Sequence, residues 1–177
     1  EMVKGVQSEG TASCIKHYLT NKSETKRTKI STEVSERALH EIYIKNYKRI
    51  IEKSDPWGLM VCYNKINGTY GCENKHILKD VLVDQLGFTG HTVSDWGAAQ
   101  RTSGASACIK AGLSLEMPGT FILSRVYKKR KVKQALDKGE VKEEDLEFII
   151  RPLLKTFMRV NLFQEKEITP PNKLDIL

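Results

Sequence analysis

Four short apolar runs of this sequence end in polar or aromatic side chains that could do chemistry together. The runs cover residues 12–19, 58–63, 91–94 and 113–116, and the side chains at or just after their ends are Lys16-His17-Tyr18, Tyr63-Asn64, Asp95-Trp96 and Glu116-Met117. A cation and an imidazole donate hydrogen bonds to hydroxyl groups, an aromatic ring packs on a sugar ring, and a carboxylate attacks an anomeric carbon. Each residue alone is common on ordinary surfaces, where a strand-end Asp usually caps a helix, but their combination favours a carbohydrate site.

The segments between these runs have the spacing of helices that could position them. Over residues 33–53, apolar side chains recur every three or four positions, at Leu39, Tyr43, Tyr47 and Ile50, which predicts one buried helix face. Further helices are predicted near residues 74–86, 104–110, 122–137 and 143–161, a long loop over 20–32 and a tight turn at 67–68.

Strands that alternate with helices predict a parallel sheet with crossover helices. Two architectures fit this pattern, a doubly wound sheet and a (β/α)₈ barrel. No glycine-rich phosphate loop follows a strand, which disfavours a dinucleotide-binding sheet. A barrel needs eight strands over about 250 residues, and four strands are predicted here. The predicted fold class is therefore α/β, as the C-terminal half of a barrel, and both architectures gather ligands at the carboxyl ends of the strands.

From Lys16 to Gly119, the sequence closely resembles the catalytic barrel of glycoside hydrolase family 3, of the β-glucosidase and β-xylosidase type. The matching motifs, in order, are Lys16-His17-Tyr18, Asn21 with Glu24 and Arg27, residues 35–43, residues 60–68, Glu73-Asn74, Gly87-Phe88, Val93-Ser94-Asp95-Trp96-Gly97 and residues 111–119. The bacterial N-acetylglucosaminidase branch of the family follows its Lys-His pair with a Pro-Gly-His-Gly type of loop. Tyr18-Leu19-Thr20 stands there instead, so the glucosidase and xylosidase branch fits better.

The resemblance implies a retaining hydrolase of β-linked glucosides or xylosides that needs neither metal nor cofactor. It assigns residues by their match to family motifs: Asp95 as nucleophile, Lys16, His17, Met60, Tyr63 and Trp96 as substrate-binding residues, and Glu24 and Arg27 as supporting residues.

The acid/base glutamate of the family has no counterpart in this sequence, because in relatives it comes from a second domain. Glu73 and Glu116 are the carboxylates nearest in sequence to the motifs, but both match positions with other roles. We therefore expect residues 1–164 to form a partial barrel domain, with residues 165–177 as a linker towards an absent second domain. The hypothesis includes a second chain that supplies the missing strands and the acid/base domain. The alternative is a non-catalytic, carbohydrate-binding remnant.

Composition argues against other classes of protein. The chain has 177 residues, a net charge of +7 and a basic run at residues 128–133, but it has no recognisable nucleic-acid-binding motif, so we interpret the run as a solvated helix face. No apolar segment approaches the roughly 20 residues of a membrane span, and the N-terminus does not resemble a signal peptide. Four cysteines without ligand-like spacing are interpreted as reduced thiols, which favours a cytoplasmic protein without a zinc site.

Overall fold

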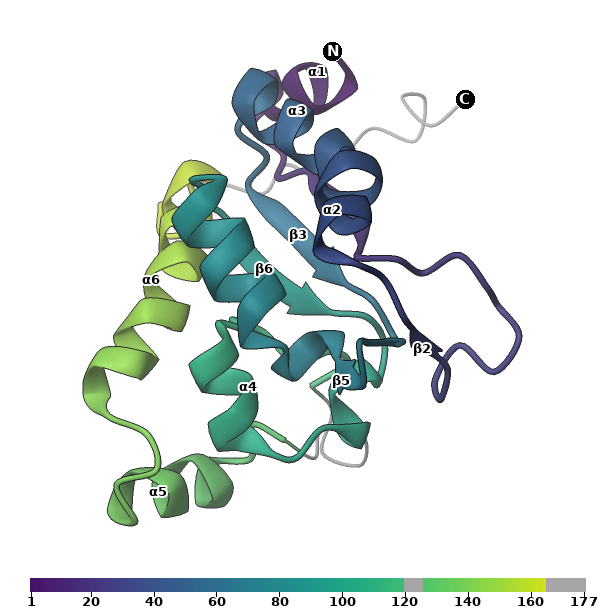
Figure 1. The fold of residues 1–177 in the computed structure, drawn as a ribbon. Coiled ribbons are helices and arrows are strands. Elements are labelled where there is room, and N and C mark those ends of the chain that lie inside the picture. Colours follow the sequence, from purple (N-terminus) through teal and green to yellow (C-terminus); the bar gives the residue numbers. More distant parts are fainter. Residues whose placement is uncertain (120–125, 165–177) are drawn as a thin grey trace, which may run out of the picture.

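A computed structural model describes residues 1–119 and 126–164, and its centre is a parallel sheet (Figure 1). The strand order is β1 (Cys14–Tyr18), β3 (Gly58–Val61) and β6 (His91–Ser94), with β3 in the middle. β3 pairs with β6 without interruption from Gly58 opposite His91 to Val61 opposite Ser94. All three chain segments point the same way, so their carboxyl ends share one rim.

Helical segments carry the chain from each strand to the next and cover the sheet, as predicted. Between β1 and β3 run three consecutive segments, α2 (Glu36–Ala38), the π-helical η1 (Leu39–Ile44) and α3 (Lys45–Ser54). Ser35 accepts a hydrogen bond from the Ala38 N–H at the start of this run, which satisfies one of the free amides of the first turn. The π-helical η3 (His76–Gln85) connects β3 to β6, and α4 (Ala105–Ala111) follows β6.

The core lies between the sheet and these crossover helices. Leu59 and Val61 of β3 are fully buried, and so are Ile77, Leu78, Val81 and Leu82 of η3. Because successive strand residues point to opposite faces, Leu59 and Val61 share the helix-covered face and Met60 points to the other one.

A second, smaller sheet was not predicted. It consists of β2 (Ser31–Thr32), β4 (Lys65–Ile66) and β5 (Thr69–Tyr70). The predicted turn at Asn67-Gly68 joins β4 to β5 as an antiparallel hairpin, and both residues have positive φ angles, 48° and 86°. Strands of two residues are too short to leave an alternating pattern in the sequence.

Three other expectations differ from the structure or lie partly outside it. The fourth predicted strand, residues 113–116, is reduced to a single bridge between Leu115 and Val93. The helix predicted near 122–137 begins only at Lys129, as α5 (Lys129–Asp137), while residues 122–125 lie outside the described part. The predicted linker, residues 165–177, also lies outside it.

The remaining elements are α1 (Met2–Ser8), the 3₁₀ turns η2 (Gly71–Glu73) and η4 (Ala98–Arg101), and α6 (Glu143–Arg159). The four cysteines are free; Cys14 is exposed and the other three are buried. Within the described residues, every helix is too short or too polar to cross a bilayer.

Candidate active site

Asp95 and His17 meet at the carboxyl rim of the sheet. Asp95 directly follows β6, and its N–H donates to the carbonyl of Val61 on β3, at 3.1 Å. Its Oδ1 accepts the Trp96 N–H at 2.7 Å, and its Oδ2 lies 3.2 Å from His17 Nε2. The Asp95 side chain is only 14% exposed. Backbone contacts therefore fix the carboxylate, while the imidazole, from β1, reaches it across β3.

His17 is itself positioned by Tyr47 of α3. The Tyr47 hydroxyl donates to the His17 carbonyl at 2.6 Å, and its ring packs edge-on against Tyr18 at 4.9 Å between centroids. Burial raises the pKa of Tyr47 to about 12, so this phenol stays a hydrogen-bond donor at neutral pH. The sequence predicted that Tyr47 lies on the apolar helix face, but helical spacing carries no information about the partner of its hydroxyl.

Tyr63 joins the site together with the two residues predicted to support it. Its hydroxyl donates to the Trp96 carbonyl at 2.9 Å. Arg27 lies over the Tyr63 ring, with its guanidinium carbon 4.5 Å from the centroid, and forms a 2.7 Å ion pair with Glu24. Partial burial, followed by the neighbouring Asp95 carboxylate, raises the pKa of Tyr63, whereas Arg27 acts to lower it.

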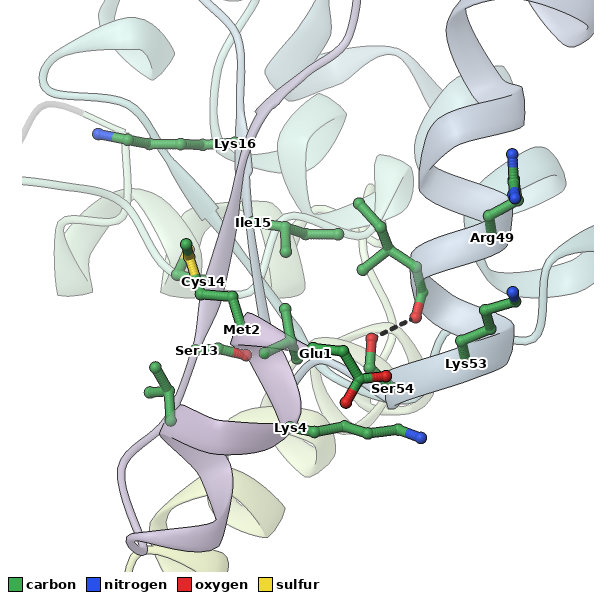
Figure 2. A pocket seen from close by; sticks show the side chains of 13 residues that line it. Glu1, Met2, Lys4, Ser13, Cys14, Ile15, Lys16, Arg49, Lys53 and Ser54 are labelled. Carbon is green, nitrogen blue, oxygen red and sulfur yellow. Dashed lines mark hydrogen bonds between the residues drawn. The ribbon is translucent and has the colours of Figure 1, made fainter.

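Three predicted substrate-binding residues lie around this centre with fewer contacts. Trp96 is 57% exposed and lines a hollow of about 440 Å³ with Tyr63 and Arg101. Met60 is half-buried and pairs in register with Val93, so strand alternation places it on the same face as Asp95. Lys16 is exposed, and Figure 2 shows its side chain extending away from α3, on the side of β1 opposite to Ile15.

The loop after β1 is tied to the rim by Asn64, which directly follows Tyr63. The Asn64 Nδ2 donates to the hydroxyls of Thr20 and Thr32, at 3.0 and 3.3 Å. Asn64 is only 1% exposed and also donates to the Lys65 carbonyl at 3.0 Å, so losing the two threonine bonds would leave a buried amide with fewer partners than it needs. This network holds the segment that carries Glu24 and Arg27 beside Tyr63. The sequence placed Asn64 within a matching motif but did not predict its partners.

Glu116 and Glu73, the other carboxylates considered for acid/base chemistry, hold backbone in place. Glu116 is only 3% exposed, and its two oxygens accept the N–H groups of Val126 and Tyr127, at 2.8 to 3.2 Å. Glu73 Oε2 accepts the Ser103 N–H at 2.6 Å. Both arrangements are typical of structural carboxylates. Within the described part of the chain, no three His, Cys, Asp or Glu side chains gather as metal ligands would.

The fold is a parallel sheet with crossover helices, and its carboxyl rim holds a fixed carboxylate beside an imidazole, a phenol and an indole. This arrangement defines an α/β domain equipped for carbohydrate chemistry. Comparison with known families agrees with this class. Residues 1–155 match the glycosyl hydrolase family 3 N terminal domain, and the chain belongs to that family.

Similar proteins and structures are glycosidases. β-Glucosidase B of Emericella nidulans is 38% identical over 168 residues, which cover 95% of this chain and 19% of that protein. The exo-α-(1→6)-L-arabinopyranosidase of Bifidobacterium longum is 44% identical over 120 residues, 68% of this chain and 16% of that enzyme. The structure of β-glucosidase 3B from Thermotoga neapolitana in complex with α-D-glucose superposes with a TM-score of 0.87 at 37% identity, covering 98% of this chain and 24% of that one.

These alignments confirm the predicted fold class, part of a (β/α)₈-type barrel, because the whole sheet and its helices align with enzymes of this family. The chain spans about a fifth of the length of the curated relatives that it matches.

Proposed function

We propose that this chain carries the nucleophile-bearing part of a retaining β-glycosidase of the β-glucosidase type, and that Asp95 is the nucleophile. The observation that carries the proposal is the geometry of Asp95. Its carboxylate stands at the end of β6, held by the Trp96 N–H and by His17 Nε2. A nucleophile must be held in a near-attack position, and two fixed partners limit the rotation of this carboxylate.

In the proposed reaction, an Asp95 oxygen bonds to the anomeric carbon while the bond from that carbon to the leaving oxygen breaks. The leaving oxygen takes a proton from an acid. The same group then acts as a base and removes a proton from water, which attacks the anomeric carbon and releases the Asp95 carboxylate. Tyr63 stays protonated because its pKa is raised, so its hydroxyl donates beside the nucleophile. Lys16 and His17 bind sugar hydroxyls, and Trp96 and Met60 line the subsite.

The acid/base carboxyl would stand about 5–5.5 Å from the nucleophile in a retaining enzyme. Glu73 and Glu116 are bound to backbone amides, and Glu24 is paired with Arg27. We therefore propose that this group comes from outside the described residues, in a polypeptide that corresponds to the unmatched part of the relatives. In this view residues 1–164 are barrel and residues 165–177 are a linker.

Trapping the glycosyl-enzyme tests this assignment. The chain is incubated with 2,4-dinitrophenyl 2-deoxy-2-fluoro-β-D-glucoside, whose leaving group needs little protonation, and peptides are mapped by mass spectrometry. We expect one fluoroglucosyl group on Asp95 and no label on Asp95→Asn. Asp84→Asn, a change at an exposed carboxylate on η3, is the matched control and should label normally. No label on folded wild-type chain, or a label elsewhere, contradicts the nucleophile assignment, and glucose binding without labelling would instead support a carbohydrate-binding remnant.

A further inference from the structure

The turn that carries Asp95, residues 94–97, is held by backbone bonds from two sides. On one side, the Asp95 N–H donates to the carbonyl of Val61 at the end of β3, at 3.1 Å. On the other side, the Gly97 N–H donates to the Met117 carbonyl at 2.9 Å. The position of the nucleophile therefore depends on where the backbone of Met117 lies.

Ser94, the last residue of β6, binds the same Met117 backbone through its side chain. Its Oγ accepts the Met117 N–H at 2.9 Å and lies 3.5 Å from the Met117 carbonyl oxygen, to which it donates weakly. The bridge between β6 and the run at 113–116 joins only Val93 to Leu115. Beyond that bridge, the Ser94 hydroxyl continues the connection between the two segments.

Burial makes this hydroxyl costly to remove. Ser94 has no solvent exposure, so water does not reach the position of its Oγ. Without the hydroxyl, the Met117 N–H would lose its acceptor, and the Gly97 N–H would be left as the bond between the turn and Met117. The Asp95 carboxylate accepts the Trp96 N–H within the same turn, so a displacement of the turn also displaces the carboxylate.

We propose that Ser94 is a positioning residue for the nucleophile: its hydroxyl, bonded to the Met117 backbone, holds the turn so that Asp95 faces the anomeric carbon. This inference rests on the proposed function. Ser94 acts through the backbone of its neighbours and not on the sugar, whose hydroxyls are assigned to Lys16 and His17 of β1. Loss of the hydroxyl should therefore slow the attack and leave sugar binding unchanged. A misplacement of about 1 Å can slow a reaction about a hundredfold, and loss of one restraint among several should do less.

Ser94→Ala tests the proposal, with Ser114→Ala as the matched control. Ser114 is also a buried serine, and its Oγ accepts the Thr92 N–H at 3.3 Å, so each variant loses a buried bond from serine to backbone. The fluoroglucoside is applied at a series of concentrations, which separates the maximal labelling rate from the half-saturating concentration. We expect Ser94→Ala to lower the maximal rate about tenfold at an unchanged half-saturating concentration, and Ser114→Ala to change neither. Circular dichroism of each variant shows that it is folded.

Amide hydrogen exchange measured by NMR gives a second readout, which does not depend on labelling. The N–H groups of Trp96 and Gly97 both donate hydrogen bonds that hold the turn. In Ser94→Ala these two amides should exchange about tenfold faster than in the wild type, because local opening of the turn becomes easier. In Ser114→Ala they should exchange at the wild-type rate.

Three outcomes overturn the proposal: Ser94→Ala is labelled at the wild-type rate, both serine variants slow labelling equally, or the half-saturating concentration rises while the maximal rate stays the same. The last outcome would assign Ser94 to sugar binding. If the folded wild-type chain is never labelled, the proposed function fails, and hydrogen exchange alone decides whether Ser94 holds the turn. Unchanged exchange of Trp96 and Gly97 in Ser94→Ala would show that it does not.

Discussion

The strands of the sheet differ in how completely they are covered: β3 and β6 are more buried than β1. β3 is paired on both edges, β6 is paired with β3 and bridged to Leu115, and Leu59 and Val61 of β3 have no solvent exposure. β1 pairs only with β3 within the described residues, and its Cys14 and Lys16 are exposed. The candidate site draws on both parts of the sheet, since Asp95 follows the buried strand β6 and His17 belongs to the edge strand β1. The difference teaches that Asp95 is fixed by contacts within well-buried strands, whereas His17 belongs to a strand that pairs on one side only within the described residues.

The largest expected effect comes from comparing β3 with β1 directly. Leu59→Ala removes a fully buried side chain from β3 and should lower the free energy of unfolding by about 2–5 kcal/mol. Ile15→Ala, on β1, should cost less, about 1–2 kcal/mol, because this side chain is already partly hydrated. Urea denaturation monitored by circular dichroism measures both. Equal losses would show that β1 is as well packed as β3.

A second comparison sets a buried carboxylate against an exposed one. Glu116→Gln replaces an acceptor of two backbone N–H groups with an amide that presents a donor to one of them, which should cost about 1–3 kcal/mol. Glu24→Gln breaks only the exposed ion pair with Arg27 and should cost less than about 1 kcal/mol. Chemical denaturation of the two variants under identical conditions measures the difference. If Glu116→Gln were as stable as wild type, Glu116 would be available for another role.

Tyr47→Phe tests how α3 positions His17. Loss of the bond to the His17 carbonyl should cost about 0.5–1.5 kcal/mol and slow fluoroglucoside labelling. The pKa of Tyr47 is about 12 in the folded chain, and the pKa of an unfolded tyrosine is near 10. Between about pH 10 and about pH 12 mainly the unfolded chain loses the Tyr47 proton. The contribution of Tyr47 to the free energy of unfolding is therefore fully present below about pH 10 and falls as the pH rises towards about 12.

Tyr47→Phe should therefore lose less stability than the wild type over this interval. Denaturation at pH 8 and at pH 11 measures the difference. Tyr70→Phe, at a partly buried phenol in the small sheet, is the control. Parallel pH profiles for wild type and Tyr47→Phe would contradict the role of the Tyr47 phenol.

The smallest expected effect concerns Arg27. Arg27→Met keeps an unbranched side chain over the Tyr63 ring but removes the charge, so stability should change by less than about 1 kcal/mol. Because Arg27 lowers the pKa of Tyr63, the variant should raise it. NMR titration of ¹³C-labelled tyrosine measures this shift, with Arg37→Met as the distant control. An unchanged Tyr63 resonance would mean that the guanidinium does not act on the phenol.

Much of the fold follows from local signals. Periodic apolar spacing predicted the helices around residues 33–53 and 74–86, and the strand at 91–94 matches β6 as observed. Local signals failed where an element exists only through distant contacts. β2 has two residues and is defined by its pairing with β4, and the run at 113–116 became a single bridge because Glu116 turns inward to bind backbone amides.

For the site, the sequence by itself determined which side chains gather at the rim, because parallel strands all end on the same edge and the motifs mark those ends. Only the tertiary structure decided how they act on one another. It placed His17 Nε2 3.2 Å from Asp95, Arg27 over Tyr63, and Glu116 against the backbone rather than in the site. The physical reason is that strand and helix spacing depends on neighbours in sequence, whereas these contacts join residues 10 to 78 positions apart. The strand order β1-β3-β6 also belongs to the tertiary structure, since the sequence pattern of a strand does not say which strands lie beside it.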